Sequence, residues 1–137
     1  MVKEVVCALI VGQGKLLIAQ HGIHSRHPWK WEFPGGKIQP GESPEEALVR
    51  EIREELNIEI RVEERLAPVT HAYGEKVIRL IPFLCRWTSG NLQLTEHHAV
   101  RWVSPDGIAG YDMLDGDHKI VGEEDNLERI TKYAGQG

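Results

Sequence analysis

The chain has 137 residues, a length that fits one domain with a substantial hydrophobic core. Its net charge of −5 at pH 7 argues against a protein that binds polymeric nucleic acid, because such proteins are usually basic, but it leaves nucleotide binding open. The N-terminus has no basic region followed by a long apolar run, so we expect no signal peptide, no membrane span and a cytoplasmic location.

The first part of the chain alternates predicted strands with turns that contain glycine. The predicted strands cover 3–11, 15–20 and 31–33. The first two form a hairpin around Gly12-Gln13-Gly14. A polar, histidine-rich loop at 21–30 is a candidate lid, and we expect one of its neighbouring tryptophans, Trp29 or Trp31, to lie in the core. Residues 34–37 (Pro-Gly-Gly-Lys) predict a turn that excludes bulky side chains and exposes backbone carbonyls.

A well-capped helix is predicted directly after this turn. Ser43 is a suitable N-cap, Pro44 fits the first helical position, and Glu46 completes a Ser-x-x-Glu capping box. Apolar residues that recur every four positions predict the buried stripe of the helix, at Leu48, Ile52 and Leu56. Asn57 follows the last regular turn, and asparagine tolerates the left-handed conformation that often ends a helix.

Acidic residues crowd this helix and the loop before it. They are Glu42, Glu51, Glu54 and Glu55. The last three share one face, because they are spaced i, i+3 and i+4, and like charges at that spacing cost about 0.2–0.5 kcal/mol per pair. A solvated acidic surface is one interpretation. The glycine-rich segment before the helix favours another, a cation site whose hard oxygen ligands suit Mg²⁺ or Mn²⁺.

The second part of the chain continues the mixture of strands and helices. Strands are predicted at 58–66, 69–73, 77–87 and 99–103. A helical turn is predicted at 105–109 and a C-terminal helix at 117–134. Cys7 and Cys85 both lie in apolar runs, so we expect buried thiols and no disulfide. This order of elements predicts an α/β sandwich.

The motif around the helix resembles the signature of the Nudix hydrolases. The matching positions are Gly36, Glu42, Arg50-Glu51, Ile52, Glu54-Glu55 and Ile58. Asn57 stands where the family has glycine, which is a mild departure because both residues accept positive φ. Residues 32–37 and Glu96 resemble the MutT branch, which hydrolyses nucleoside triphosphates to a monophosphate and pyrophosphate. The resemblance implies one domain over 1–137, an α/β/α sandwich with a mixed central β-sheet, an acidic catalytic helix and a C-terminal helix.

The resemblance also implies a metal centre for Mg²⁺, with Mn²⁺ as an alternative. The implied ligands are the carbonyl of Gly35 and the carboxylates of Glu51, Glu54, Glu55 and Glu96. Glu54 or Glu96 would take the proton from the attacking water, and the sequence does not choose between them. Arg50 would hold the carboxylates in register, and Glu42 would serve as a carboxylate linked to the metal site. A structural Ca²⁺ site is the weaker alternative, because the chain has no Asp-rich EF-hand loop.

Five residues are candidates for substrate binding: Lys37, Phe33, Asp117, His21 and Lys76. Lys37 would reach a phosphate, and Phe33 would either pack under a base or belong to the core. His21 stands where many MutT-like proteins carry arginine, so either phosphate binding differs or Arg26 or Lys76 compensates. By resemblance Asp117 contacts the base. An ionised Asp117 would favour bases that present donors, such as cytosine or guanine, and a protonated one would imitate an amide.

Exposed loop positions are expected for His97 and His98, although both could assist the metal site. The sequence predicts Mg²⁺-dependent hydrolysis of a nucleoside triphosphate by a monomer or homodimer. The first candidate is a modified nucleotide such as 8-oxo-dGTP, as in pool sanitation and DNA repair, and CTP or a modified cytosine nucleotide is the alternative. An inactive nucleotide-binding regulator is a rival, and so is an enzyme for a sugar nucleotide, a dinucleoside polyphosphate or an mRNA cap.

Overall fold

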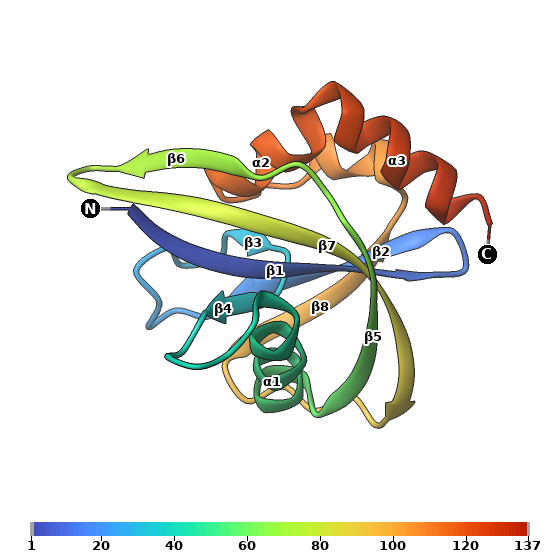
Figure 1. The fold of residues 1–137 in the computed structure, drawn as a ribbon, viewed down its shortest axis with the longest axis horizontal. Helices are drawn as coiled ribbons and strands as arrows, with labels where there is room; N and C mark the ends of the chain where they lie inside the picture. The colour runs from blue at the N-terminus through green and yellow to red at the C-terminus, as the bar shows by residue number, and fades with distance from the viewer. Residues whose placement is uncertain (1, 137) are drawn as a thin grey trace.

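A parallel pair of long strands, β1 and β7, forms the centre of a mixed sheet in the computed structural model, which describes residues 2–136 (Figure 1). The strands are β1 (Val2–Gly12), β2 (Lys15–His21), β3 (Trp31–Glu32), β4 (Gly35–Lys37), β5 (Ile58–Arg65), β6 (Val69–Tyr73), β7 (Lys76–Gly90) and β8 (His97–Val103). The helices are α1 (Pro44–Leu56), the short 3-10 helix η1 (Pro105–Gly110), α2 (Asp115–Gly122) and α3 (Glu124–Ala134).

The sheet follows the path β3-β2-β1-β7-β5, and three further strands pair outside this path. β4 pairs with β1, β6 with β7, and β8 with β2. The β1–β7 pair is parallel, whereas the other strand pairs are antiparallel. The predicted mixed sheet is therefore confirmed.

Alternation along β1 divides the core into two layers. Side chains in a strand point to opposite faces of the sheet in turn. Val6, Ala8 and Ile10 pack in the layer beneath α1. Cys7, Leu9 and Val11 pack in the layer beneath α2 and α3. Figure 1 shows α1 on one side of the sheet and α2 with α3 on the other, which confirms the α/β/α sandwich.

Local signals in the sequence determine both ends of α1. Ser43 and Glu46 form the predicted capping box, in which Glu46 N donates to Ser43 Oγ at 3.1 Å and Ser43 N donates to Glu46 Oε1 at 2.9 Å. Asn57 ends the helix in the left-handed region, with φ of 59°. The predicted buried stripe is also correct, because Leu48, Ile52 and Leu56 are all buried.

Cysteine and tryptophan placements agree with the predictions. Both thiols, Cys7 and Cys85, are free and buried. Trp31 is buried, whereas Trp29 is exposed, so one of the two tryptophans belongs to the core. None of the helices within residues 2–136 has the length and apolarity needed to span a membrane.

The C-terminal helix differs from the prediction, which placed one helix at 117–134. Two helices, α2 and α3, occupy this region, and they are separated at Glu123. Glu123 has extended backbone angles, with φ of −75° and ψ of 123°, and its carboxylate accepts from the backbone N–H groups of Asp125 and Asn126. Glu123 therefore acts as the N-cap of a new helix, so two helices stand where continuous periodicity predicted one.

Two strands also differ from their predictions. The glycine-rich segment 35–37 is not a turn but the strand β4, which pairs with β1 so that Gly35 lies opposite Cys7 and Lys37 opposite Val5. β8 begins at His97 rather than at Ala99, because His97 pairs with His21 of β2 across a β-bulge. Both errors concern pairing between distant parts of the chain, which local sequence patterns do not report.

Candidate active site

Two glycines of β4 let the backbone approach closely on both sides. A Cβ atom at Gly36 would overlap the carboxyl group of Glu51 on α1. A Cβ atom at Gly35 would overlap the backbone carbonyl of Val6 on β1. The backbone of β4 therefore lies directly against an acidic side chain of α1, and the predicted exclusion of bulky side chains from this segment is confirmed.

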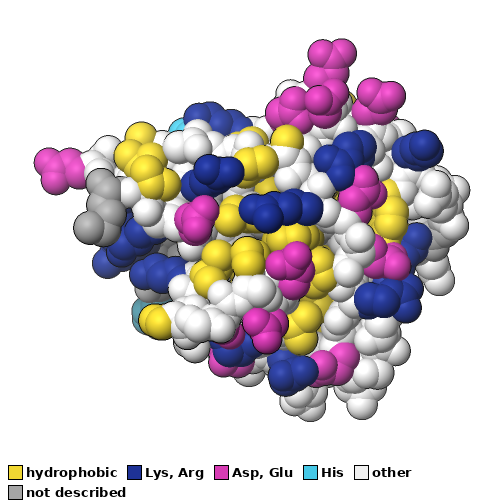
Figure 2. Space-filling view, viewed as in Figure 1, with side chains coloured by type: hydrophobic (Ala, Val, Ile, Leu, Met, Phe, Trp, Pro, Cys, Tyr) yellow, Lys and Arg dark blue, Asp and Glu magenta, His cyan; other side chains and the backbone are white. Residues whose placement is uncertain are grey.

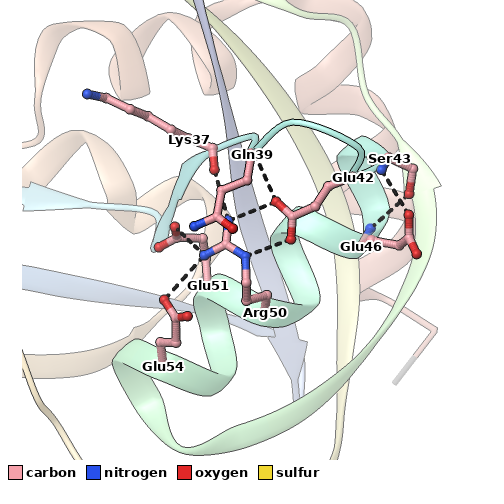
Figure 3. A network of polar contacts seen from close by, with 8 residues as sticks. All are labelled: Lys37, Gln39, Glu42, Ser43, Glu46, Arg50, Glu51 and Glu54. Atoms are coloured by element: carbon pink, nitrogen blue, oxygen red, sulfur yellow. Dashed lines mark hydrogen bonds and ion pairs between the residues drawn. The ribbon is translucent and has the colours of Figure 1, made fainter.

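Arg50 organises the acidic residues of the helix (Figure 3). Its Nε and Nη2 donate to the two carboxylate oxygens of Glu42, at 2.6 and 3.0 Å. Its Nη1 donates to Glu51 Oε1 at 3.0 Å and to Glu54 Oε2 at 3.2 Å, and Nη2 also donates to the carbonyl of Lys37 at 3.1 Å. The planar guanidinium thus joins three carboxylates and β4, the geometry expected of a residue that holds the carboxylates in register.

Glu55 differs from the other acidic residues because it is almost fully buried. It is 5% exposed, and its Oε1 has no hydrogen-bond partner among the described residues. Burial raises the pKa of Glu55 to about 9, with further contributions from the charges of Glu32, Glu51 and Glu96. The carboxyl is therefore neutral near pH 7, and a cation that binds it must displace a proton.

The carboxylates suit a hard divalent cation, but they are not assembled around one point. Within the described part of the chain, no three His, Cys, Asp or Glu side chains form a ready-made metal site. Arg50 accounts for this, because it holds Glu51 and Glu54 in ion pairs. The side chain of Glu54 is 58% exposed, so its ion pair with Arg50 lies in contact with solvent. The unpartnered oxygen of Glu55 and the crowded oxygen donors therefore fit Mg²⁺ once these side chains turn from the arginine.

Glu96 lies in the loop before β8, near the acidic face of α1. Burial raises the pKa of Glu51 and Glu55, and the charge of Glu96 is among the lesser causes for both. The structure therefore brings Glu96 near two carboxylates that are 45 and 41 positions away in the sequence. Its own side chain is exposed.

Glu32, a half-buried acid for which no role was predicted from the sequence, lies beside this cluster. His21 Nε2 is 3.0 Å from Glu32 Oε1, and His97 Nε2 is 2.8 Å from Oε2. Burial opposes the charge of Glu32, but the two histidine hydrogen bonds lower its pKa. The contact with Glu32 raises the pKa of His21, which favours the protonated form of His21.

The exposed position predicted for His97 is wrong, because its side chain is 4% exposed. Pairing of β8 with β2 turns this residue inward, opposite His21. His98 points the other way and is exposed, as expected. The alternation of the strand gives the physical reason, since neighbouring residues face opposite sides of a sheet.

A cavity of about 860 Å³ opens beside this histidine–glutamate group. Its lining includes four of the five predicted substrate-binding residues, namely His21, Phe33, Lys76 and Asp117. Phe33 is 2% exposed, so it belongs to the core and also forms part of the cavity wall. Lys37 is not part of the lining, and Figure 3 shows its ammonium group pointing away from the glutamates of α1.

Asp117 is 4% exposed and lies against the backbone of Phe33. Phe33 N donates to Asp117 Oδ2 at 2.7 Å. Burial raises the pKa of Asp117 well above its ordinary value, and the charge of Glu32 raises it further. Burial thus favours the protonated form of Asp117, in which a carboxyl can act as both donor and acceptor, as an amide does.

An acidic helix packed on a mixed sheet, beside a cavity of this size, is the arrangement of a hydrolase that binds a cation and a nucleotide. A family model described as the NUDIX domain matches residues 2–122, and the chain belongs to the Nudix hydrolase family. Members of this family generally need a divalent metal ion, typically Mg²⁺. The resemblance stated from the sequence is thus confirmed.

Named relatives are found among both sequences and solved structures. The chain is 41% identical over 118 residues to the CTP pyrophosphohydrolase of Escherichia coli (strain K12), covering 86% of this chain and 87% of the relative. It is 40% identical over 81 residues to the 8-oxo-dGTP diphosphatase of Proteus vulgaris, covering 59% and 70%. The solution structure of the E. coli ORF135 protein matches with a TM-score of 0.79 and 37% identity, covering 93% of this chain and 91% of that one.

Proposed function

We propose that the protein hydrolyses a nucleoside triphosphate to its monophosphate and pyrophosphate with the help of Mg²⁺. The observation that carries this proposal is the buried carboxyl of Glu55. Its Oε1 has no hydrogen-bond partner among the described residues, and the carboxylates of Glu51 and Glu96 lie nearby. A cation bound there would displace the proton of Glu55 and give its unpartnered oxygen a partner. The cavity of about 860 Å³, which Glu32 helps to line, provides room for the nucleoside.

The five predicted ligands would hold the cation: the carbonyl of Gly35 and the carboxylates of Glu51, Glu54, Glu55 and Glu96. When bound, Mg²⁺ supplies neutralisation of phosphate charge and a water of lowered pKa. Arg50 keeps Glu51 and Glu54 in register through the bonds of 3.0 and 3.2 Å.

Water attacks the β-phosphorus in the proposed reaction. Its oxygen forms the new bond, and the bond from that phosphorus to the bridging oxygen of the α-phosphate breaks. The monophosphate leaves with the bridging oxygen, and the proton of the water passes to a carboxylate. Glu54 and Glu96 are both exposed and are the two candidates for this proton transfer.

Positive side chains beside the cavity support binding of a triphosphate. Arg26 and Lys76 line the cavity, as does His21, whose protonated form is favoured by the contact with Glu32. The charge of Lys37, followed by that of Lys76, lowers the pKa of Lys3, so these cations lie near one another. Figure 2 shows Lys and Arg side chains gathered beside the N-terminal end of β1. We propose that this group attracts the anionic substrate to a chain of net charge −5.

Cytosine nucleotides are the substrates that we propose first. The amino group and N3 of cytosine are a donor and an acceptor, and a neutral Asp117 complements both. The relative that is 41% identical is named for CTP. The second candidate is 8-oxo-dGTP, because a neutral carboxyl imitates the amide that reads an oxidised guanine, and a relative is named for that nucleotide.

A panel of canonical, oxidised and methylated nucleotides, assayed for kcat/KM, tests this choice. We expect the highest value for a cytosine nucleotide. Asp117→Asn should keep the order of preference, because an amide also offers a donor and an acceptor, and Asp117→Leu should reduce discrimination about 10-fold, the effect of losing a paired hydrogen bond. Thermal melting checks that both variants fold.

The panel and the Asp117 variants can contradict the proposed substrate, the neutral state of Asp117 or the proposed function itself. A maximum at 8-oxo-dGTP would replace the first candidate by the second. A reversed order of preference in Asp117→Asn would contradict the neutral carboxyl, because only an ionised carboxylate differs from an amide in this way. No turnover of any nucleotide would overturn the proposed function.

A further inference from the structure

The loop that carries Glu96 also caps the C-terminal end of α1. The last carbonyl groups of a helix have no partner within the helix. Three of these carbonyls accept hydrogen bonds from the loop that follows β7. Gln93 N donates to Leu56 O at 2.9 Å, Thr95 N to Glu55 O at 3.2 Å, and Thr95 Oγ1 to Glu54 O at 2.9 Å. The loop is therefore attached to Glu54 and Glu55, two of the three α1 residues that the proposed function assigns to the cation.

His97, the residue that follows Glu96, is also held in place, by a contact with Glu32 of β3. His97 Nε2 lies 2.8 Å from Glu32 Oε2, and the imidazole is buried. Glu96 itself has an exposed side chain. Both of its neighbours in the sequence thus hold fixed positions, Thr95 against α1 and His97 against β3, while the carboxylate between them lies next to that of Glu55.

We propose that Thr95 and His97 are positioning residues that hold Glu96 beside the carboxylates of α1. This inference rests on the proposed function, in which Glu96 is a metal ligand. A carboxylate in an exposed loop would otherwise lose conformational freedom each time a cation bound, and that loss weakens binding. Two anchors fix the backbone on both sides of Glu96 before the cation arrives, so the loss on binding is smaller.

Thr95→Val tests the first anchor, because it removes the hydroxyl and keeps the shape of the side chain. Mn²⁺ binding to the nucleotide-free protein is measured by electron paramagnetic resonance, and hydrogen exchange is followed at residues 91–97. We expect the Mn²⁺ dissociation constant to rise about 10-fold, since residues that orient metal ligands typically contribute 10- to 100-fold. Exchange in the loop should accelerate. In the turnover assay kcat should fall by a similar factor, with KM for the nucleotide changed less than about twofold.

Two variants separate positioning from a general loss of structure. Thr95→Ser keeps the hydroxyl and should restore Mn²⁺ affinity. Thr88→Val is the matched control, because Thr88 Oγ1 donates to the carbonyl of Glu59 at 3.1 Å in an equally exposed bond between β7 and β5. It should bind Mn²⁺ as the wild type does.

The second anchor is tested in the same way at His97. His97→Leu removes the bond to Glu32, and His97→Gln restores a donor. The leucine variant should lose Mn²⁺ affinity, and the glutamine variant should recover part of it.

Unchanged Mn²⁺ affinity and loop exchange in Thr95→Val would overturn the inference, as would an equal loss in Thr88→Val. Failure of the proposed function is distinguishable from this result. If the wild type turns over no nucleotide but Thr95→Val still weakens Mn²⁺ binding, the positioning role stands and the assigned reaction falls.

Discussion

Replacement of Glu54 by glutamine is expected to lower kcat by about 10²-fold or more, the range of a lost general base or metal donor. The fold should remain intact, because Glu54 is 58% exposed and its ion pair with Arg50, at 3.2 Å, lies at the surface. Exposed ion pairs contribute at most about 1 kcal/mol to stability. The measurement is the rate of pyrophosphate release at saturating nucleotide, together with the thermal melting temperature.

Glu45→Gln is the matched control for this variant. Glu45 lies on the same helix and is exposed, and removal of its charge should leave kcat unchanged. Near-normal turnover of Glu54→Gln would remove Glu54 from the mechanism and leave Glu96 as the candidate for the proton transfer.

Gly36→Ala is expected to have the second large effect. The new Cβ atom would overlap the carboxyl group of Glu51, which would have to leave its bond to Arg50 at 3.0 Å. A misplaced ligand weakens cation binding, so we expect Mn²⁺ affinity to fall about 10-fold or more and kcat to fall with it. Titration of Mn²⁺ into the purified variant measures the affinity.

Gly110→Ala serves as the control for the glycine substitution. A Cβ atom at Gly110 meets nothing within 4 Å, so this variant should bind Mn²⁺ as the wild type does. Wild-type affinity in Gly36→Ala would contradict the close packing of β4 against Glu51 as a requirement of the site.

The parts of the fold that local sequence patterns encode were predicted correctly. Helix α1 is the best example, because its capping box, its apolar stripe and the left-handed Asn57 all act within a few residues. Strand β4 was missed, because glycine has little preference for strands and the pairing partner in β1 lies 28 positions away at Cys7. The division of the C-terminal helix was missed, because a glutamate cap at Glu123 interrupts helical periodicity without a typical capping residue.

In the candidate site, too, contacts within one helix could be predicted from the sequence, whereas contacts between distant residues could not. The contact of Arg50 with Glu54 follows from the i, i+4 spacing along one helix, so the sequence could indicate it. The contact with Glu51 joins neighbours in the sequence, which do not normally face each other on a helix. The bond between Glu32 and His97 joins residues 65 positions apart, and no local pattern predicts it. An acid between the buried residues Trp31 and Phe33 was the available signal, since an acid in a core strand needs a partner.

Product analysis with the wild-type protein and Mg²⁺ tests the central claim most directly. A nucleoside triphosphate that the protein accepts should yield the monophosphate and pyrophosphate in equal amounts, without orthophosphate, and a chelator should stop the reaction. Release of orthophosphate with a nucleoside diphosphate, or undiminished turnover in the chelator, would contradict the proposed function.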